Sequence, residues 1–198
     1  MLKRLFDITV ATFALVGLAP IMLLLMLAIR LDNAGPAIFR QTRVGRYGRE
    51  FQIHKFRTMV ASDVNLGPWL TAGDDARITR LGRWLRAHRL DELPQLVDVL
   101  TGHMSMVGPR PEVPHYVAQV PTATREAWLA VRPGMTDPAS LAHLDEAAQL
   151  VHTHDPEAEY VARVLPRKIA MSIQYAERAT LRSDAAVLWA TVKRLVTS

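Results

Sequence analysis

The sequence predicts a predominantly helical α+β protein that is held at a membrane surface. Residues 8–29 form an apolar run without a formal charge, which is typical of a membrane helix. Residues 37–58 change to a period of two around turn-forming residues, which predicts a short β-hairpin. Helical spacing dominates the sequence from residue 78 onward. Because 198 residues suit a single domain, we expect one domain over 1–198, with 1–32 as its membrane helix and 33–198 as its cytoplasmic or interfacial part.

The composition restricts the partners of the chain. Its formal net charge is +5 and its pI is about 10.0, which favours anionic partners such as nucleic acid, a phosphorylated substrate or anionic lipid. The chain contains no cysteine, which excludes a disulfide framework, a thiolate nucleophile and a cysteine-based zinc site. The glycine-rich phosphate-binding motifs of nucleotide-hydrolysing folds do not occur in it.

The apolar run is long enough to cross a membrane but contains a proline in its middle. As a straight helix, residues 8–29 would extend about 33 Å, against a hydrocarbon core of roughly 30 Å. Pro20 removes a backbone hydrogen bond and kinks a helix. Basic residues lie on both sides of the run, namely Lys3 and Arg4 before it and Arg30, Arg40, Arg43, Arg46 and Arg49 after it. This distribution favours a re-entrant helix kinked at Pro20, with a spanning helix and a buried core helix as alternatives.

The β-hairpin is expected to carry two cations at its end. Residues 37–39 and 51–56 are the predicted strands, and residues 45–48 supply the turn. Strand alternation would point Lys55 and Arg57 to the same face. Arg46 and Arg49 in the turn region suit an anionic membrane surface.

An arginine-rich amphipathic helix is expected after the hairpin. Asp74 and Asp75 precede it and are the expected N-cap residues. Its apolar residues are Ile78, Leu81, Trp84 and Leu85, and its arginines recur every three residues at 77, 80, 83, 86 and 89. This pattern predicts a helix at the lipid headgroups, although an ordinary surface helix has a similar pattern.

Two adjacent carboxylates, Asp91 and Glu92, follow these arginines. We expect a helix to begin near Asp91, because Asp is a favoured N-cap and Pro94 is tolerated in a first turn. The helix dipole would then favour the ionised form of both acids. An ordinary cap with an acidic first turn is the alternative interpretation. Downstream, Pro109 and Pro111 fix the backbone around Arg110, which suits bidentate recognition of a phosphate.

The last third of the sequence predicts helices without an evident site. We expect helices over residues 116–130 and 157–178, with a break at Pro166, and a final helix capped by Ser183. Residues 132–136 are predicted to be a loop. His143, His152 and His154 lack the spacing of metal motifs and are interpreted as surface residues, and His103 as a structural residue.

Six blocks, taken in order, resemble the polyprenyl-phosphate hexose-1-phosphate transferases, also called small monotopic phosphoglycosyl transferases. The blocks are residues 3–7, 39–45, 55–59, 90–95, 104–111 and 132–136. The resemblance implies transfer of a sugar-1-phosphate from a UDP-sugar to polyprenyl phosphate, expected to be undecaprenyl phosphate, with release of UMP. It also implies a monotopic protein on the cytoplasmic face of a bacterial inner membrane, acting at the first membrane step of glycoconjugate assembly.

The resemblance assigns roles to individual residues. It implies that Asp91 is the nucleophile, forming a phosphosugar-aspartyl intermediate, with Glu92 as its neighbour in metal or proton handling. Mg²⁺, or Mn²⁺, is the expected cofactor, with Asp91 and Glu92 as its protein ligands, because this hard cation binds carboxylate and phosphate oxygens. The cations expected at the substrate phosphates are Lys55, Arg57, Arg86 and Arg110. Nucleic acid is not an expected partner.

Residues 137–141 depart from the family pattern in a region often tied to sugar choice, so the resemblance does not assign the sugar. Two other functions remain as alternatives. One is a non-enzymatic, membrane-tethered module that binds anions through its arginines, for which the acidic pair is unnecessary. The other is a lipid-phosphate phosphatase that uses the same acids.

Overall fold

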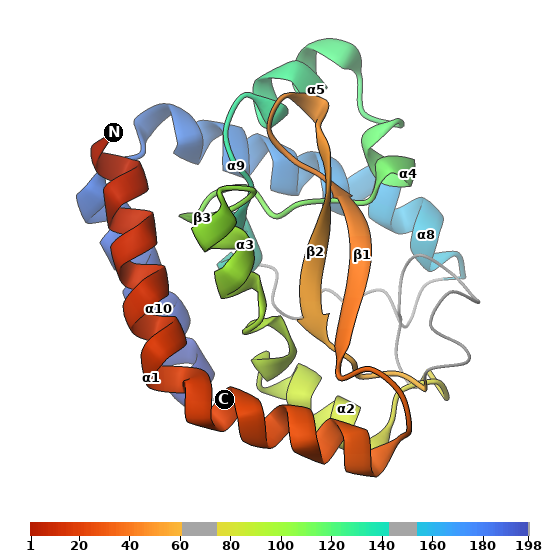
Figure 1. The fold of residues 1–198 in the computed structure, drawn as a ribbon. Helices are drawn as coiled ribbons and strands as arrows, with labels where there is room; N and C mark the ends of the chain where they lie inside the picture. The colour runs from red at the N-terminus through yellow and green to blue at the C-terminus, as the bar shows by residue number, and fades with distance from the viewer. Residues whose placement is uncertain (61–74, 143–153, 198) are drawn as a thin grey trace.

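A computed structural model describes residues 1–60, 75–142 and 154–197 (Figure 1). It confirms the predominantly helical α+β class. The elements in chain order are α1 Leu2–Asp32, β1 Ile38–Val44, η1 Arg46–Gly48, β2 Glu50–Phe56, α2 Arg80–Ala87, η2 Leu90–Glu92, α3 Gln95–Thr101, β3 Ser105–Val107, α4 Pro114–Val117, α5 Thr122–Leu129, β4 Gly134–Thr136, α6 Pro138–Ala142, α8 Pro156–Glu159, η3 Tyr160–Val164, α9 Leu165–Arg178 and α10 Leu181–Thr197.

Helix α1 is a single helix with Pro20 inside it. It bends in its middle, so that its first half runs beside α10 and its second half passes under the hairpin (Figure 1). Proline is a common cause of such a bend, because it removes a backbone donor and displaces the preceding turn. Among the described residues, α1 is the one helix long and apolar enough to cross a membrane. Its exposed large apolar residues include Phe13, Val16, Leu23 and Leu24.

Both ends of α1 are bonded to the folded body of the protein. Near its start, buried Asp7 accepts hydrogen bonds from Ser105 Oγ at 2.8 Å and from the backbone N–H of Met106 at 3.1 Å. Arg4 donates to the carbonyl oxygens of Val99 and Leu100. At the other end, Arg57 donates to the carbonyl oxygen of Ile29 in the last turn of the helix and to those of Asn33 and Ala34 directly after it. The bent helix is therefore fixed to the same body at both ends.

The predicted β-hairpin is confirmed. Strands β1 and β2 are antiparallel, with a register that runs from Ile38 opposite Phe56 to Val44 opposite Glu50. The structure adds a parallel pair, β3 and β4, where the sequence predicted a loop over 132–136. These strands lie close together at two glycines: a Cβ on Gly134 would come within 2.1 Å of the backbone nitrogen of Gly108.

Several predicted helix boundaries were wrong. Thr79, and not Asp75, caps α2 by accepting from the N–H of Gly82, while Asp75 accepts from Arg77. Asp74 lies outside the described residues. The expected helix over 116–130 is two helices, α4 and α5, separated at Pro121, which lacks the N–H needed to continue a helix.

At the C-terminal helices, Pro166 causes no break. It lies in the first turn of α9, which follows directly from the π-helical turn η3, and a first turn tolerates proline. Ser183 lies inside α10, which begins at Leu181. Thr180 and Ser183 bond each other's backbone N–H groups, the reciprocal arrangement of a capping box.

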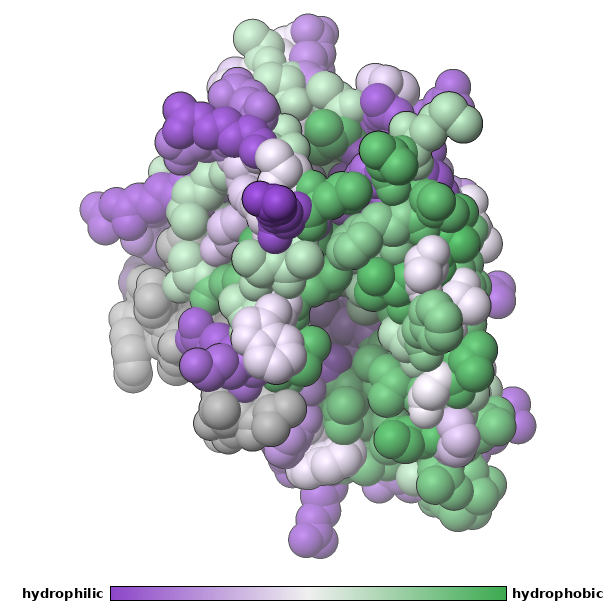
Figure 2. Space-filling view, turned by 90° about the vertical axis from the view of Figure 1, so that its left-hand side faces the viewer, coloured by the Kyte–Doolittle hydropathy of each residue, from purple (hydrophilic) through white to green (hydrophobic). Residues whose placement is uncertain are grey.

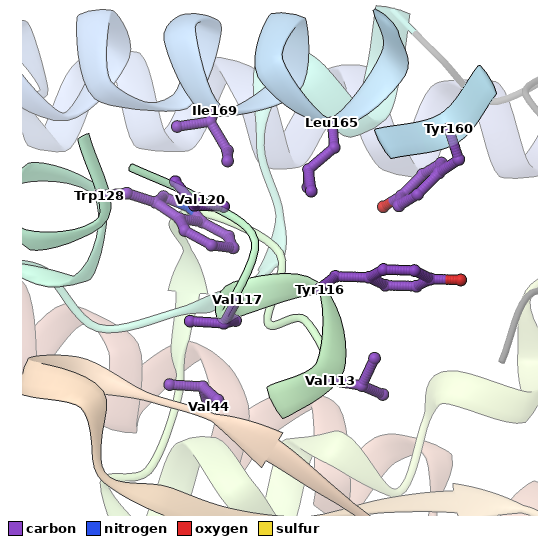
Figure 3. Packing of buried hydrophobic residues seen from close by; sticks show 9 residues of the cluster. All are labelled: Val44, Val113, Tyr116, Val117, Val120, Trp128, Tyr160, Leu165 and Ile169. Atoms are coloured by element: carbon purple, nitrogen blue, oxygen red, sulfur yellow. The ribbon is translucent and has the colours of Figure 1, made fainter. Parts of the chain in front are cut away.

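One of the buried apolar clusters joins the hairpin to the C-terminal helices (Figure 3). It contains Val44, Val113, Tyr116, Val117, Val120, Trp128, Tyr160, Leu165 and Ile169. Helix α9 thereby packs against α4 and α5, and residues from three distant parts of the sequence meet in one buried cluster.

Candidate active site

The predicted acidic pair and three of its four predicted cations line one cleft of about 1480 Å³. Lys55 reaches it from β2, Arg86 from α2 and Arg110 from the loop after β3. The same cleft is lined by apolar residues of α1 and α10, including Leu18, Leu188 and Val192. On the face that carries these two helices, a hollow with a hydrophilic interior opens beside hydrophobic surface (Figure 2).

The acids do not begin an α-helix, which corrects the expectation from sequence. Asp91 and Glu92 lie in the short 3-10 turn η2, and α3 begins at Gln95 after Pro94. Arg89 precedes the turn in the left-handed conformation, with a φ of 52°, so α2 does not continue into the turn. The surroundings of the two side chains therefore determine their charge more than a helix dipole does.

Glu92 is held by two cations. Its Oε1 accepts from Lys55 Nζ at 3.0 Å, and its Oε2 accepts from Arg110 Nη1 at 3.0 Å. Arg110 Nη2 also donates to Oε1, so the guanidinium binds the carboxylate with both of its arms. Burial favours the neutral acid, but Arg110 and Lys55 outweigh burial and hold the pKa of Glu92 well below its usual value. Glu92 is therefore ionised.

Asp91 has a different environment, although it is the next residue. Burial raises its pKa first, and the charge of Glu92 raises it further; Lys55, Arg86 and Arg110 offset only part of this. Within the described parts of the chain, no hydrogen bond holds its carboxylate. Asp91 therefore has free carboxylate oxygens in a cation-lined cleft, next to an acid whose charge is already compensated. Two carboxyl groups with opposite pKa shifts are typical of an enzyme site in which they have different roles.

The cations are positioned by neighbouring residues. Arg86 Nε donates to Thr58 Oγ1 at 2.8 Å, which directs the guanidinium toward the acids from α2. Burial lowers the pKa of Lys55, while Glu92 acts against that shift. Arg110 donates to Glu92 and lies between Pro109 and Pro111, as the sequence indicated. Their substrate-binding roles remain predictions, which this arrangement supports.

Arg57 does not join this cluster, which corrects the expectation that it shares a face with Lys55. Strand β2 ends at Phe56, so the alternation does not continue to Arg57. Its guanidinium is buried and donates to the carbonyl oxygens of Ala34 at 2.8 Å, of Ile29 and of Asn33. Carbonyl groups at the end of a helix lack intrahelical partners. Arg57 thus binds the C-terminal end of α1, and we assign it no phosphate.

Four further residues of the cleft were missed from sequence. Arg43 and Glu112 lie within or next to the blocks that carry the family resemblance, but nothing in those blocks assigns them a role. Tyr160 and Lys168 come from the C-terminal helices, in a region with no recognisable motif. Only the packing of α9 against α4 and α5 brings them to Glu112, so no local signal could have found them.

The acids suit a hard divalent cation that takes most of its ligands from elsewhere. No group of three or more His, Cys, Asp or Glu residues able to hold a metal occurs in the described parts of the chain. Asp91 offers free oxygens, whereas those of Glu92 already accept from Lys55 and Arg110. Mg²⁺ typically uses one or two protein carboxylates together with phosphate oxygens and water, so this donor set fits an ion that arrives with a diphosphate.

Of the histidines singled out in the sequence, His103 and His154 do not line the cleft. His103 bonds Thr101 and stacks on Phe51 with ring centroids 5.6 Å apart, which agrees with its interpretation as a structural residue. His143 and His152 lie outside the described residues. His154 belongs to no candidate metal group in the described parts of the chain.

The whole chain, residues 1–198, matches the family model described as bacterial sugar transferase. Over 99% of its length it is 38% identical to the UDP-glucose:undecaprenyl-phosphate glucose-1-phosphate transferase of Caulobacter vibrioides, of which it covers 70%. It is 37% identical to the undecaprenyl-phosphate glucose phosphotransferase of Komagataeibacter xylinus, over 99% of the chain and 36% of that protein. It is 34% identical to the UDP-N-acetylgalactosamine-undecaprenyl-phosphate N-acetylgalactosaminephosphotransferase of Aeromonas hydrophila, over 99% of the chain and 44% of that protein. The chain thus spans less than half the length of two of these three relatives.

Proposed function

We propose that this chain, which belongs to the bacterial sugar transferase family, transfers a sugar-1-phosphate from a UDP-sugar to polyprenyl phosphate. The observation that carries the proposal is the free carboxylate of Asp91, surrounded by Lys55, Arg86 and Arg110 in a cleft with an apolar wall. The relatives named above act with undecaprenyl phosphate but differ in their sugar. Undecaprenyl phosphate is therefore the proposed acceptor, and the sugar is left unassigned.

The proposed reaction has two steps. An oxygen of Asp91 attacks the phosphorus that bears the sugar, and the bond from that phosphorus to the bridging oxygen breaks, so that UMP leaves with the bridging oxygen. A phosphate oxygen of the lipid then attacks the same phosphorus and releases the Asp91 carboxylate, which leaves the sugar on a polyprenyl diphosphate. Lys55, Arg86 and Arg110 stabilise the negative charge on the phosphate oxygens in both steps. Glu92 holds Lys55 and Arg110 in position.

The apolar wall of the cleft suits the lipid acceptor. It is formed by Ala14 and Leu18 of α1 and by Leu188, Val192 and Leu195 of α10. A polyprenyl phosphate could enter from the membrane along this wall, because its chain is apolar and its phosphate is drawn to the cations. A module that only binds anions is not favoured, because it would have no use for a free buried carboxylate among its cations.

A single assay tests the proposed function. Membrane fractions containing the chain are incubated with a panel of UDP-sugars, with and without undecaprenyl phosphate, and UMP release and sugar transfer to lipid are measured. We expect at least one UDP-sugar to give UMP together with lipid-bound sugar phosphate. Release of inorganic phosphate from the lipid, with no sugar attached to it, would instead identify a lipid-phosphate phosphatase.

Mg²⁺ is proposed as the cofactor; Asp91 would hold it, with Glu92 beside it, where the substrate diphosphate binds. When bound, it would neutralise diphosphate charge in a partly dehydrated cleft. EDTA should therefore abolish sugar transfer, and Mg²⁺ or Mn²⁺ added in excess should restore it. Binding of UDP-sugar, measured by calorimetry, should weaken in EDTA as well. Unchanged transfer in the presence of chelator would remove the metal from the proposal.

We further propose that the chain lies on the cytoplasmic face of a bacterial inner membrane, with α1 entering and leaving through one leaflet. The bonds of Asp7 to β3 and of Arg57 to the other end of α1 support this placement, because both ends of the helix contact one folded body. A helix that crossed the bilayer would place its two ends on opposite sides of the membrane, so one of these two sets of contacts would be lost.

Cysteine labelling tests this placement. Because the chain has no native cysteine, Leu2→Cys and Asp32→Cys give two single labelling sites, both exposed in the structure. In intact cells neither site should react with a membrane-impermeant thiol reagent, and both should react after permeabilisation. Pro20→Leu should increase labelling at residue 2 in intact cells, because it restores the missing backbone donor and favours a straight helix. Labelling of the Leu2→Cys site in intact cells without that substitution would contradict the re-entrant arrangement.

A further inference from the structure

Helix α10 runs beside the first half of α1, from the start of that helix to the turn before its bend (Figure 1). At the start, Lys3 Nζ lies 2.8 Å from a carboxylate oxygen of buried Asp184. Farther along, Leu188 packs against the apolar cluster that contains Ala11. Leu18, just before the bend, lines the cleft together with the C-terminal half of α10. Because the two helices are held together along this length, α10 lies close to the membrane wherever the first half of α1 enters it.

The two faces of α10 differ in their exposure. Asp184, Leu188 and Thr191 follow one another at helical spacing and face the protein, where Thr191 Oγ1 lies 2.8 Å from Thr136 Oγ1. The opposite face carries Ala185, Trp189 and Val192, all of which are exposed. Trp189 is 71% exposed and Val192 is 52% exposed. The outer face of α10 is therefore apolar, although it is not covered by other described residues.

This apolar face is continuous in position with the proposed membrane helix. The first half of α1, which α10 accompanies, has Phe13 and Val16 exposed at 76% and 70%. Hydrophobic surface covers much of the face that carries these two helices (Figure 2). Large exposed apolar patches mark interaction sites with proteins or membranes. A bilayer that takes up the exposed side of α1 also meets the outer face of α10.

The charges of α10 favour a membrane with anionic headgroups. Its exposed charged residues are Arg182, Lys193 and Arg194, all of which are basic, and they lie at the two ends of the uncharged segment 185–192. Basic ends around an apolar face with a tryptophan are typical of a helix that lies in the headgroup region. A second copy of the chain fits less well. In a symmetric contact through α10, either orientation would bring basic ends together, and like charges disfavour association.

We propose that α10 is a second membrane-contacting helix, which lies in the headgroup region with Ala185, Trp189 and Val192 toward the lipid. The inference rests on the proposed membrane placement of α1 and is independent of the transfer reaction. It also gives the cleft a direct connection to the bilayer, because Val192 is both exposed and part of the apolar cleft wall. A polyprenyl chain then stays in contact with apolar groups while its phosphate reaches the cations.

Fluorescence quenching at single cysteines tests this contact. Because the chain has no native cysteine, Ala185→Cys and Trp189→Cys each give one exposed labelling site on the outer face of α10. The full chain is labelled with a fluorophore and placed in nanodiscs of phosphatidylethanolamine and phosphatidylglycerol, with nitroxide quenchers attached to the lipids near the headgroup or near the chain end. Both sites should lose more fluorescence to the shallow quencher than to the deep one, because an interfacial helix lies only about 5–10 Å into the boundary of headgroups and acyl chains.

Two reference sites are measured in the same way. Thr124→Cys lies at an exposed position of α5, which packs against α9, and it should be quenched by iodide in the water and not by the lipid quenchers. Val16→Cys lies on the exposed side of α1 near its bend, and it should lose more fluorescence to the deep quencher. Iodide should have little effect at residues 185 and 189.

Each contrary result has a distinct meaning. Iodide quenching at residues 185 and 189 as strong as at residue 124 would show that α10 faces water and would overturn the inference. Protection of both sites from iodide and from the lipid quenchers would indicate a protein contact, such as a second copy of the chain, and would also overturn it. If residue 16 meets no lipid quencher either, the placement of α1 fails as well. If residue 16 does meet one, only the inference about α10 fails.

Discussion

Asp91→Asn should abolish sugar-phosphate transfer, with a loss of roughly 10³-fold or more, as is typical when an enzyme loses its nucleophile. The amide has nearly the same shape as the carboxylate but is a far poorer nucleophile. Glu92→Gln should behave differently: turnover should fall sharply because Lys55 and Arg110 lose their anchor, while a weak first step should remain. Initial rates of UMP release and of lipid-linked sugar formation, measured for both variants, check this pair of expectations.

Protein stability separates a catalytic role of Asp91 from a structural one. Its carboxylate accepts no hydrogen bond from the described residues, and burial and Glu92 disfavour its ionised form. A neutral side chain should therefore fold at least as well, and the unfolding temperature of Asp91→Asn should equal or exceed that of the unaltered chain. Loss of activity together with a large fall in that temperature would indicate that Asp91 supports the fold instead.

Arg110→Lys should be nearly as damaging, although it preserves the charge. Arg110 binds Glu92 with both arms of its guanidinium, and the loop between Pro109 and Pro111 orients it. A lysine offers a single ammonium group that cannot reproduce this fork or present a second donor to a phosphate. We expect kcat to fall by roughly 10²-fold, comparable to the loss of one preorganised donor in other enzymes.

The control for Arg110→Lys is Arg80→Lys, which makes the same change at an exposed position of α2 outside the cleft. Arg80→Lys should leave kcat unchanged. If Arg110→Lys also keeps its full kcat, two-armed binding by Arg110 has no part in the reaction, and a point charge at that position is sufficient.

The sequence was most informative where function depends on neighbouring residues. The hairpin, the acidic pair and the constrained Arg110 were all found from local patterns, and the cleft brings them together. The position of Arg57 was predicted wrongly because strand alternation was extended one residue beyond the last paired position, Phe56. At the next residue the chain leaves the sheet, and carbonyl groups in the last turn of α1 and directly after it bind the guanidinium instead.

Features that depend on contacts between distant segments could not be predicted. Strands β3 and β4 have three residues each and pair across a long separation, which leaves no periodic signal. The same holds for the hydrogen bond of Tyr160 to Glu112 and for the ion pair of Lys168 with Glu112. The opposite pKa shifts of Asp91 and Glu92 also depend on side chains from β2, α2 and the Arg110 loop, so a helix-dipole argument could not separate the two acids.

The most direct test of Asp91 as nucleophile is a rapid-mixing experiment without any lipid acceptor. The purified chain is mixed with its preferred UDP-sugar, and UMP is quantified over time. If Asp91 takes the sugar phosphate, about one equivalent of UMP per enzyme should appear and release should then stall, because a covalent intermediate accumulates. Asp91→Asn should show no such burst. Release of UMP only after polyprenyl phosphate is added, with turnover retained in Asp91→Asn, would contradict the account and indicate direct attack by the lipid phosphate.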